Sequence, residues 1–219
     1  MQASIKWLKE YVEFTETPDV LAEMLTMAGV PVEGITDLGK GIDNIVTGKI
    51  IGIEKHPNAT KLSVCTIDVG SEKLTIVTGA TNVKVGQIVP VALVGAKLPN
   101  GLEIQPTDLR GLMSYGMLCS TSELNIASKL LSPEAREGIY ILSNDLAIGM
   151  DIKEALGLDD VVLEFELTAN RADCFSVLGL AREVAVLTGG TFKKPMLSVR
   201  ENAQEKSTDL VKVVIEEPA

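Results

Sequence analysis

The spacing of apolar residues in the first 29 positions predicts two helices. Ser4 can cap the first helix, and the second begins at Thr17-Pro18, where a capping hydroxyl precedes a proline at the first helical position. Gly29 predicts a left-handed end to the second helix. The apolar positions that recur at helical spacing are Ile5, Leu8, Tyr11 and Val12, followed by Leu21, Met24, Leu25 and Ala28. Residues 30–38 then have the pattern of a short extended segment.

Between about Ile42 and Met150 the pattern changes to short β-rich runs separated by Gly, Pro and Asn turns. An apolar face that changes phase within residues 61–69 predicts a bulge or a tight bend. About five short strands and no long helix predict a small closed barrel, with a short helix at Ser122–Ala127. The expected strands are Val46–Lys55, Lys61–Val69, Lys73–Thr78 and Ile88–Val94, with short pieces near Gly116–Ser120 and Gly138–Leu142.

Helical signals return after Met150. A short helix is expected at Asp151–Leu156, ended by Gly157, and the strongest helix of the chain at Ser176–Thr188. Between them, Val161–Thr168 alternates between apolar and polar residues, as a strand does. Leu210–Ile215 is expected to begin another strand, which suggests that the chain is part of a longer protein.

The predicted fold class is α+β, with a small helical domain interrupted by an inserted five-stranded OB-fold (oligonucleotide-binding) β-barrel. Neither helical end buries enough surface to fold well alone, whereas insertion at a surface loop is tolerated when the loop ends lie close together. The expected domains are residues 1–40 plus 151–195 for the discontinuous helical domain, 41–150 for the barrel, and 196–219 for a linker and the start of a further, truncated domain.

Composition and charge restrict the kinds of ligand that the chain can bind. The net charge is −10, yet residues 41–150 hold 9 basic and 10 acidic residues, so the barrel is nearly neutral and the remainder carries about −9. Because phosphate affinity comes mostly from Lys and Arg, any RNA contact must use a local patch on the barrel. Aromatic residues make up 4%, too few for a site of many stacked bases.

The three cysteines, Cys65, Cys119 and Cys174, are widely spaced and form no metal-binding motif. Reduced thiols fit a cytoplasmic protein. Neither a signal peptide nor a membrane-spanning apolar run is present in the sequence, so no membrane partner is expected.

No catalytic residue and no metal ligand is predicted. His56 is the single histidine, no nucleophile elbow accompanies it, and no phosphate-binding glycine loop occurs. Glu164 and Glu166 are interpreted as a solvated strand face. Arg171 and Asp173 belong to a turn that leads into the last strong helix, where they could pair with each other.

Two motifs stand out, Lys55–Leu62 and Leu109–Ser120. The first is a strand connection in which His56 packs on a turn made by Pro57, or a loop that offers polar groups to phosphates and bases, as the loop between the first two strands of an OB-fold often does. In the second, two glycines permit a tight path and Arg110 and Ser114 would point outward; structural and functional interpretations remain open for both. The candidate RNA contacts are Lys55, Asn58, Lys61, Arg110, Ser114 and Ser120.

These motifs resemble the tRNA-binding OB module of the EMAP II type, although Thr60 stands where that module often has Asp. The segments on either side resemble the bacterial phenylalanyl-tRNA synthetase β-subunit family. The matching stretches are Ser4–Val12, Leu25–Gly34 and Leu167–Val184, the last with Ala169 where Pro is usual. Stand-alone modules lack these flanks.

The resemblance implies an enzyme that uses ATP and Mg²⁺ to join phenylalanine to its tRNA, with a catalytic α subunit as partner in an (αβ)₂ heterotetramer. It also implies that this fragment holds no cofactor, binds tRNA weakly by itself, and lacks aminoacylation and editing activity. Two alternatives stay open: a structural module that braces the β subunit and its assembly with α, or a stand-alone OB-fold tRNA-binding protein.

Overall fold

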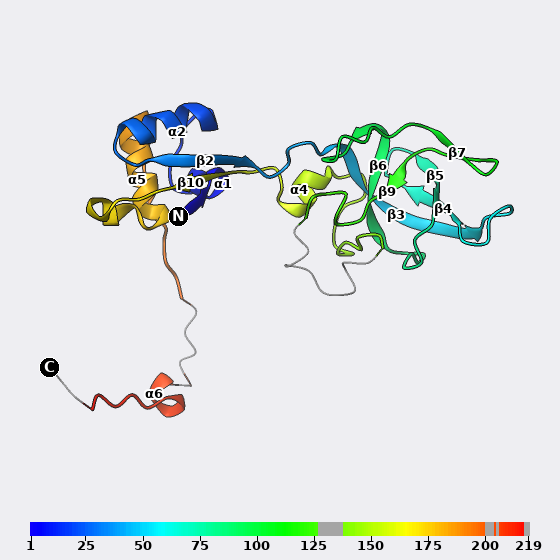
Figure 1. The fold of residues 1–219 in the computed structure, drawn as a ribbon. Helices are drawn as coiled ribbons and strands as arrows, with labels where there is room; N and C mark the ends of the chain where they lie inside the picture. The colour runs from blue at the N-terminus through cyan, green and yellow to red at the C-terminus, as the bar shows by residue number, and fades with distance from the viewer. Residues whose placement is uncertain (127–137, 200–203, 205, 217–219) are drawn as a thin grey trace.

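The computed structural model describes residues 1–126, 138–199, 204 and 206–216. Figure 1 shows two lobes joined by two segments of the chain, one that follows β2 and one that leads into β10. We call them the terminal lobe, which holds β1, α1, α2, β2, β10, η2 and α5, and the barrel lobe, which holds β3 to β9 and α4. In the described part of the chain, no helix combines the length and the apolar character needed to cross a membrane.

The terminal lobe combines the two ends of the described fold in one sheet. The antiparallel order is β1-β10-β2, and Ala3 pairs with Leu163, which in turn pairs with Ile35. One hydrophobic core contains residues from 3–30 and from 163–184. The elements are β1 (Gln2–Ser4), α1 (Ile5–Lys9), α2 (Pro18–Met27), β2 (Val32–Asp37), β10 (Val161–Phe165), the 3₁₀ helix η2 (Ala169–Cys174) and α5 (Val177–Thr188). The expected helical domain therefore also contains a three-stranded sheet. Its strands β2 and β10 lie in the two segments predicted as extended, and only β1 was not predicted.

The predicted starts of both helices and the end of α2 are confirmed by their capping hydrogen bonds, whereas α1 ends at Lys9, before Tyr11 and Val12. Ser4 Oγ accepts from the Trp7 backbone N–H at 3.0 Å, and Thr17 Oγ1 accepts from that of Val20 at 3.5 Å. Gly29 has a φ of +80°, and the Val30 N–H reaches back to the Leu25 carbonyl at 2.9 Å. This is the Schellman arrangement, in which a left-handed residue lets the chain satisfy the last carbonyls of the helix.

Arg171 ties η2 to its neighbours. Its guanidinium lies 3.1 Å from Asp173 and 2.7 Å from Glu183 of α5, and it donates to the Ala28 carbonyl at the end of α2 at 3.4 Å. The hydrogen bond from Arg171 lowers the pKa of Asp173, and burial raises the pKa of the Cys174 thiol to about 11. The sequence left open whether Arg171 pairs with Asp173; in the structure it pairs with two carboxylates, and Ser176 rather than Asp173 caps α5.

The barrel lobe is a curled antiparallel sheet of order β5-β4-β3-β6-β9. Its strands are β3 (Asp43–Lys55), β4 (Ser63–Asp68), β5 (Lys73–Thr78), β6 (Ile88–Lys97) and β9 (Met117–Leu118), with a separate hairpin of β7 (Thr107–Leu109) and β8 (Leu112–Ser114). Five of the six predicted strand segments are confirmed, whereas the predicted closure of the barrel is not. The strand ladder does not close between β5 and β9, so the described sheet is a half-barrel, and the Tyr115 N–H donates to the Thr75 carbonyl at 2.9 Å beside β5.

The irregularity predicted for residues 61–69 lies in the partner strand. Ile50 pairs with Ile67 and Gly52 with Thr66, so the extra residue is Ile51 of β3. Along β4 the buried positions alternate regularly because Cys65 faces the core. The predicted change of phase arose because Cys65 was not counted among the core-facing residues, although a free cysteine behaves as a small apolar side chain.

Three other expectations fail. Residues 122–126 form a turn rather than a helix, and Ala127 lies outside the described residues. The segment 138–142 contributes an isolated bridge between Leu142 and Ile88 instead of a strand. Ser207–Leu210 forms a four-residue helix, α6, and residues 211–215 form no strand with any described residue. Strand structure requires a partner for its backbone hydrogen bonds, and none is described there.

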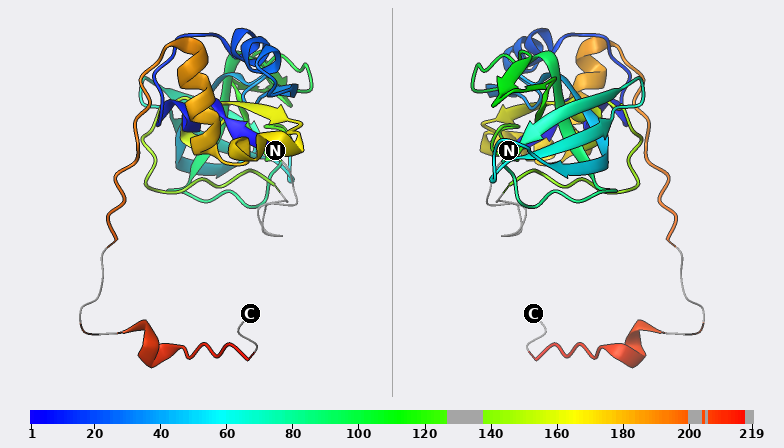
Figure 2. Two further views of the ribbon diagram at one scale, coloured as in Figure 1. Left: turned by 90° about the vertical axis from the view of Figure 1, so that its left-hand side faces the viewer. Right: turned by 90° about the vertical axis from the view of Figure 1, so that its right-hand side faces the viewer.

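The helix expected after Met150 is confirmed as α4 (Ile152–Leu156), capped by Asp151 and ended by left-handed Gly157. Ile152 is buried in the core of the barrel lobe, although it follows the barrel in sequence. Figure 2 shows residues 190–199 leaving the terminal lobe after α5. The linker expected within residues 196–219 lies partly outside the described residues.

Candidate nucleic-acid interface

The loop of residues 56–62, between β3 and β4, is fastened from within by its histidine. His56 is only 5% exposed. Its Nδ1 accepts the Asn58 backbone N–H at 3.1 Å, and its Nε2 lies 2.9 Å from the Leu109 carbonyl. Because Nδ1 acts as an acceptor, the neutral ring carries its proton on Nε2 and donates it to Leu109. His56 is therefore a structural fastening, and it joins the first motif to the second.

The second motif begins with the hairpin of β7 and β8. Leu109 pairs with Leu112, and the two turn residues, Arg110 and Gly111, have φ of 57° and 91°. Positive φ at both central positions defines a type I′ turn, whose twist matches that of paired strands. Asp108 Oδ1 accepts the Gly111 N–H at 2.6 Å and holds the turn closed.

A second hydrogen bond joins the two motifs. Asn58 Nδ2 donates to the Arg110 carbonyl at 3.1 Å. Together with the His56–Leu109 bond, it latches two loops that are about fifty residues apart in sequence. We call this pair of hydrogen bonds the loop latch. Because the side-chain amide of Asn58 donates one of these two hydrogen bonds, Asn58 helps to hold the two loops together.

Three cationic candidates project from this latched region. Lys55, Lys61 and Arg110 are exposed, and none of the ion pairs found among the described residues involves them. Lys55 ends β3, Lys61 lies in the first loop, and Arg110 occupies the hairpin turn. These three side chains are the cations that the two loops could offer to a phosphate.

The other two candidates lie elsewhere. Ser114 is 3% exposed; its Oγ accepts the Val77 N–H at 3.1 Å and donates to the Gly116 carbonyl at 3.0 Å. The expectation that Ser114 points outward is therefore wrong, because its hydroxyl replaces a missing backbone partner for β5. Ser120 Oγ donates to Glu123 at 2.8 Å.

Ser114 and Ser120 line a cavity of about 590 Å³ next to the end of β5. None of the three exposed cations lines it. The carboxylate of Glu123 does, and it disfavours a phosphate there. The sequence candidates thus divide into a cationic set at the loop latch and a structural set at the half-barrel edge.

Asp173, Cys174 and Glu183 are the one grouping in the described part of the chain whose ligand atoms could surround a metal ion. The Arg171 guanidinium already contacts the oxygens of Asp173 and Glu183 and the sulfur of Cys174. Since the Arg171 guanidinium already occupies the position between these three side chains, they do not fit a divalent metal ion.

Comparison with known proteins agrees with this geometry. Residues 45–149 match the family described as "Putative tRNA binding domain". The curled half-barrel sheet is consistent with an OB-like fold, and the match assigns residues 45–149 to the class of putative tRNA-binding domains.

The match continues beyond the module into both flanks. A phenylalanine–tRNA ligase β subunit from Moorella thermoacetica is 50% identical over 218 residues, which is 100% of this chain and 27% of the relative. One from Syntrophus aciditrophicus is 43% identical over 205 residues, 94% of this chain and 25% of the relative. The chain belongs to the phenylalanine–tRNA ligase β-subunit family and corresponds to its N-terminal region. It spans about a quarter of the length of these relatives.

Among solved structures, a MetRS related protein from Pyrococcus horikoshii is 19% identical, with 51% of this chain and 88% of that chain covered. Its TM-score of 0.35 is too low to establish a shared fold.

Proposed function

We propose that this chain is the N-terminal part of the β subunit of phenylalanine–tRNA ligase, which attaches phenylalanine to tRNA using ATP, and that its barrel lobe contacts tRNA. The observation that carries the proposal is the loop latch. It brings two distant motifs together and holds Lys55, Lys61 and Arg110 exposed and free of ion pairs with described residues.

The backbone of Arg110 supports a role for its side chain. A type I′ turn favours Asn, Asp or Gly, yet this position holds an arginine at a φ of 57°. The left-handed conformation costs a residue with a Cβ roughly 1–2 kcal/mol. Such strain is commonly stored at functional sites. An arginine kept at this position is consistent with contact to an anionic ligand.

The remaining parts of the proposal concern the whole enzyme. The catalytic α subunit would be the partner in an (αβ)₂ assembly, and ATP and Mg²⁺ would be bound outside this chain, which alone would catalyse neither aminoacylation nor editing. The division into residues 1–40 plus 151–195, 41–150 and 196–219 is supported by the separate cores of the two lobes, except that α4 packs in the core of the barrel lobe and so shifts that boundary beyond residue 150.

A filter-binding titration of the 219-residue chain with a tRNA(Phe) transcript, over a series of salt concentrations, tests tRNA contact. We expect log K to fall linearly with log salt, and Lys61→Ala and Arg110→Ala each to weaken binding and to reduce the slope by about 1. Lys194→Ala removes an exposed lysine outside the barrel lobe and serves as the matched control. A slope unchanged in both barrel variants would exclude these residues as phosphate contacts.

The structural alternative is favoured by the near-neutral charge of the barrel and by the two serine hydroxyls that bind the fold itself. It predicts that removing residues 42–150 from the full enzyme impairs assembly with α and leaves the KM for tRNA normal. The tRNA-contact proposal predicts the reverse: assembly kept and KM raised.

A further inference from the structure

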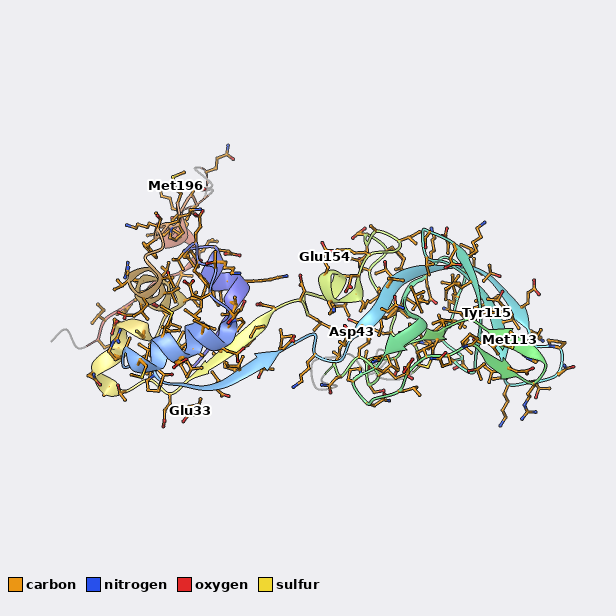
Figure 3. All side chains as sticks on the ribbon, turned by 90° about the horizontal axis from the view of Figure 1, so that it is seen from above. Glu33, Asp43, Met113, Tyr115, Glu154 and Met196 are labelled. Atoms are coloured by element: carbon orange, nitrogen blue, oxygen red, sulfur yellow. The ribbon has the colours of Figure 1, made fainter. Side chains whose placement is uncertain are left out.

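The barrel lobe displays one aromatic ring to solvent. Residues 41–150 contain only two aromatic residues, Tyr115 and Tyr140. Tyr140 is half-buried against the core, whereas Tyr115 is 46% exposed. Figure 3 shows Tyr115 on the β4–β5 side of the barrel lobe, far from the terminal lobe, with Met113 labelled close by in the view. A lobe with so few aromatic residues leaves one of them uncovered.

The backbone under Tyr115 is held on both sides. Its own N–H donates to the Thr75 carbonyl of β5 at 2.9 Å. The preceding Ser114 hydroxyl is fixed by two hydrogen bonds, and Gly116 has a φ of 142°, where a Cβ would lie 2.8 Å from the Ala92 carbonyl oxygen. The ring therefore projects from a rigid edge, so binding a ligand to it requires little ordering of the backbone.

A shallow cavity of about 480 Å³ lies beside the ring. Its walls are about half polar and half apolar, and its polar groups are Asn44, Thr75, Glu72 and Lys73. Asn44 already donates its side-chain amide to the Val94 carbonyl at 3.0 Å. Because Lys73 and Glu72 balance each other, charge alone selects no ligand here. The feature that distinguishes this surface is therefore the exposed ring of Tyr115.

We propose that Tyr115 is a stacking platform for one unpaired base of bound RNA. The inference rests on the proposed tRNA contact and names the part of the RNA that this edge recognises. A tyrosine ring matches a base in shape and polarity, and base–aromatic stacking tolerates any base. A single ring accommodates one exposed nucleotide, which agrees with the low aromatic content of the lobe.

The platform is tested by substituting Tyr115 in the 219-residue chain. We expect Tyr115→Ala to weaken binding of a tRNA(Phe) transcript by about 5- to 150-fold, the range for one stacked base. Tyr115→Phe should bind like the wild type, and Tyr115→Leu should lose affinity as Ala does. The salt slope should stay unchanged in all three, because no charge is removed.

The control is Phe175→Ala, which removes a 60%-exposed aromatic ring from the terminal lobe and should leave affinity unchanged. A single-stranded RNA carrying 2-aminopurine gives a direct readout, since stacking on Tyr115 quenches its fluorescence and Tyr115→Phe preserves the quenching.

Each result decides a different point. If the wild type binds with a salt slope that depends on Lys61 and Arg110 while Tyr115→Ala binds equally well, the platform is refuted and the proposed function stands. If Tyr115→Leu keeps full affinity, the ring acts only as apolar surface, as for a protein partner, and stacking is refuted. If the wild type does not bind the transcript at all, both the proposed function and this inference fail.

Discussion

Replacing His56 with phenylalanine tests the loop latch directly. Phenylalanine keeps a ring of similar size and removes both hydrogen bonds, the one from the Asn58 N–H at 3.1 Å and the one to the Leu109 carbonyl at 2.9 Å. A hydrogen bond contributes about 0.5–1.5 kcal/mol net, so the free energy of unfolding should fall by about 1–3 kcal/mol. Loss of the latch should also loosen both loops, although the hairpin lies far from residue 56 in sequence.

The loss of stability is measured by urea denaturation followed by far-UV circular dichroism. The fluorescence of Trp7 is a poor probe here, because this single tryptophan lies in the terminal lobe. Loosening is measured by amide hydrogen exchange, which should rise in residues 56–62 and 107–114 together and stay unchanged in β10. The matched variant Asn58→Ala removes only the 3.1 Å bond to Arg110 and should have a smaller effect.

Measurements of tRNA affinity distinguish the effect of the latch from the effect of the cations that it positions. His56→Phe should weaken binding without changing the salt slope, because the three basic side chains remain. The role of His56 in holding the two loops is refuted if the free energy of unfolding changes by less than about 0.5 kcal/mol, the usual scatter of neutral surface substitutions. It is equally refuted if exchange rises only in residues 56–62, since the hairpin would then be held independently.

Two further predictions concern the sheets. A side-chain hydrogen bond with Glu166 raises the pKa of Glu33 above 4.5, so stability linked to this proton is complete below that pH and is lost as the pH rises through the raised value. Glu33→Gln, which mimics the protonated acid, should raise Tm at pH 7.5 and have less effect at pH 4.5. The control Glu23→Gln, at an exposed position, should change Tm equally at both pH values. Equal effects of Glu33→Gln at the two pH values would contradict the linkage. In the barrel lobe, a Cβ on Gly48 would lie 2.5 Å from Val91 Cγ2, so Gly48→Ala should destabilise by about 1–3 kcal/mol in urea, and a neutral result would mean that the core yields at no cost.

The elements that sequence patterns predicted well are those decided by neighbouring residues. The helix starts at Ser4 and Thr17 follow from a hydroxyl that accepts an N–H three residues later, which is a local event. The strand β5 was predicted with its observed bounds, because turns flank it on both sides. The family motifs are local as well, and for this reason they identified the β-subunit relatives without any coordinates.

The terminal lobe shows where local patterns fail. The three residues of β1 are too few to display a period, and their partners in β10 are more than 150 positions away. The segment 210–215 shows the opposite error, since apolar residues predicted a strand for which no described partner exists. Strand identity depends on pairing, and pairing over long separations is a property of the folded chain.

The candidate site divides in the same way. The sequence by itself determined which residues carry cations, that His56 lies at a strand connection, and that Arg110 and Ser114 belong to one motif. Only the tertiary structure decided that His56 and Asn58 hold the hairpin, that Ser114 turns inward to β5, and that Tyr115 is left exposed. The physical reason is that burial and hydrogen-bond partners come from segments about forty to fifty residues away, so neighbouring positions of one motif can have opposite roles.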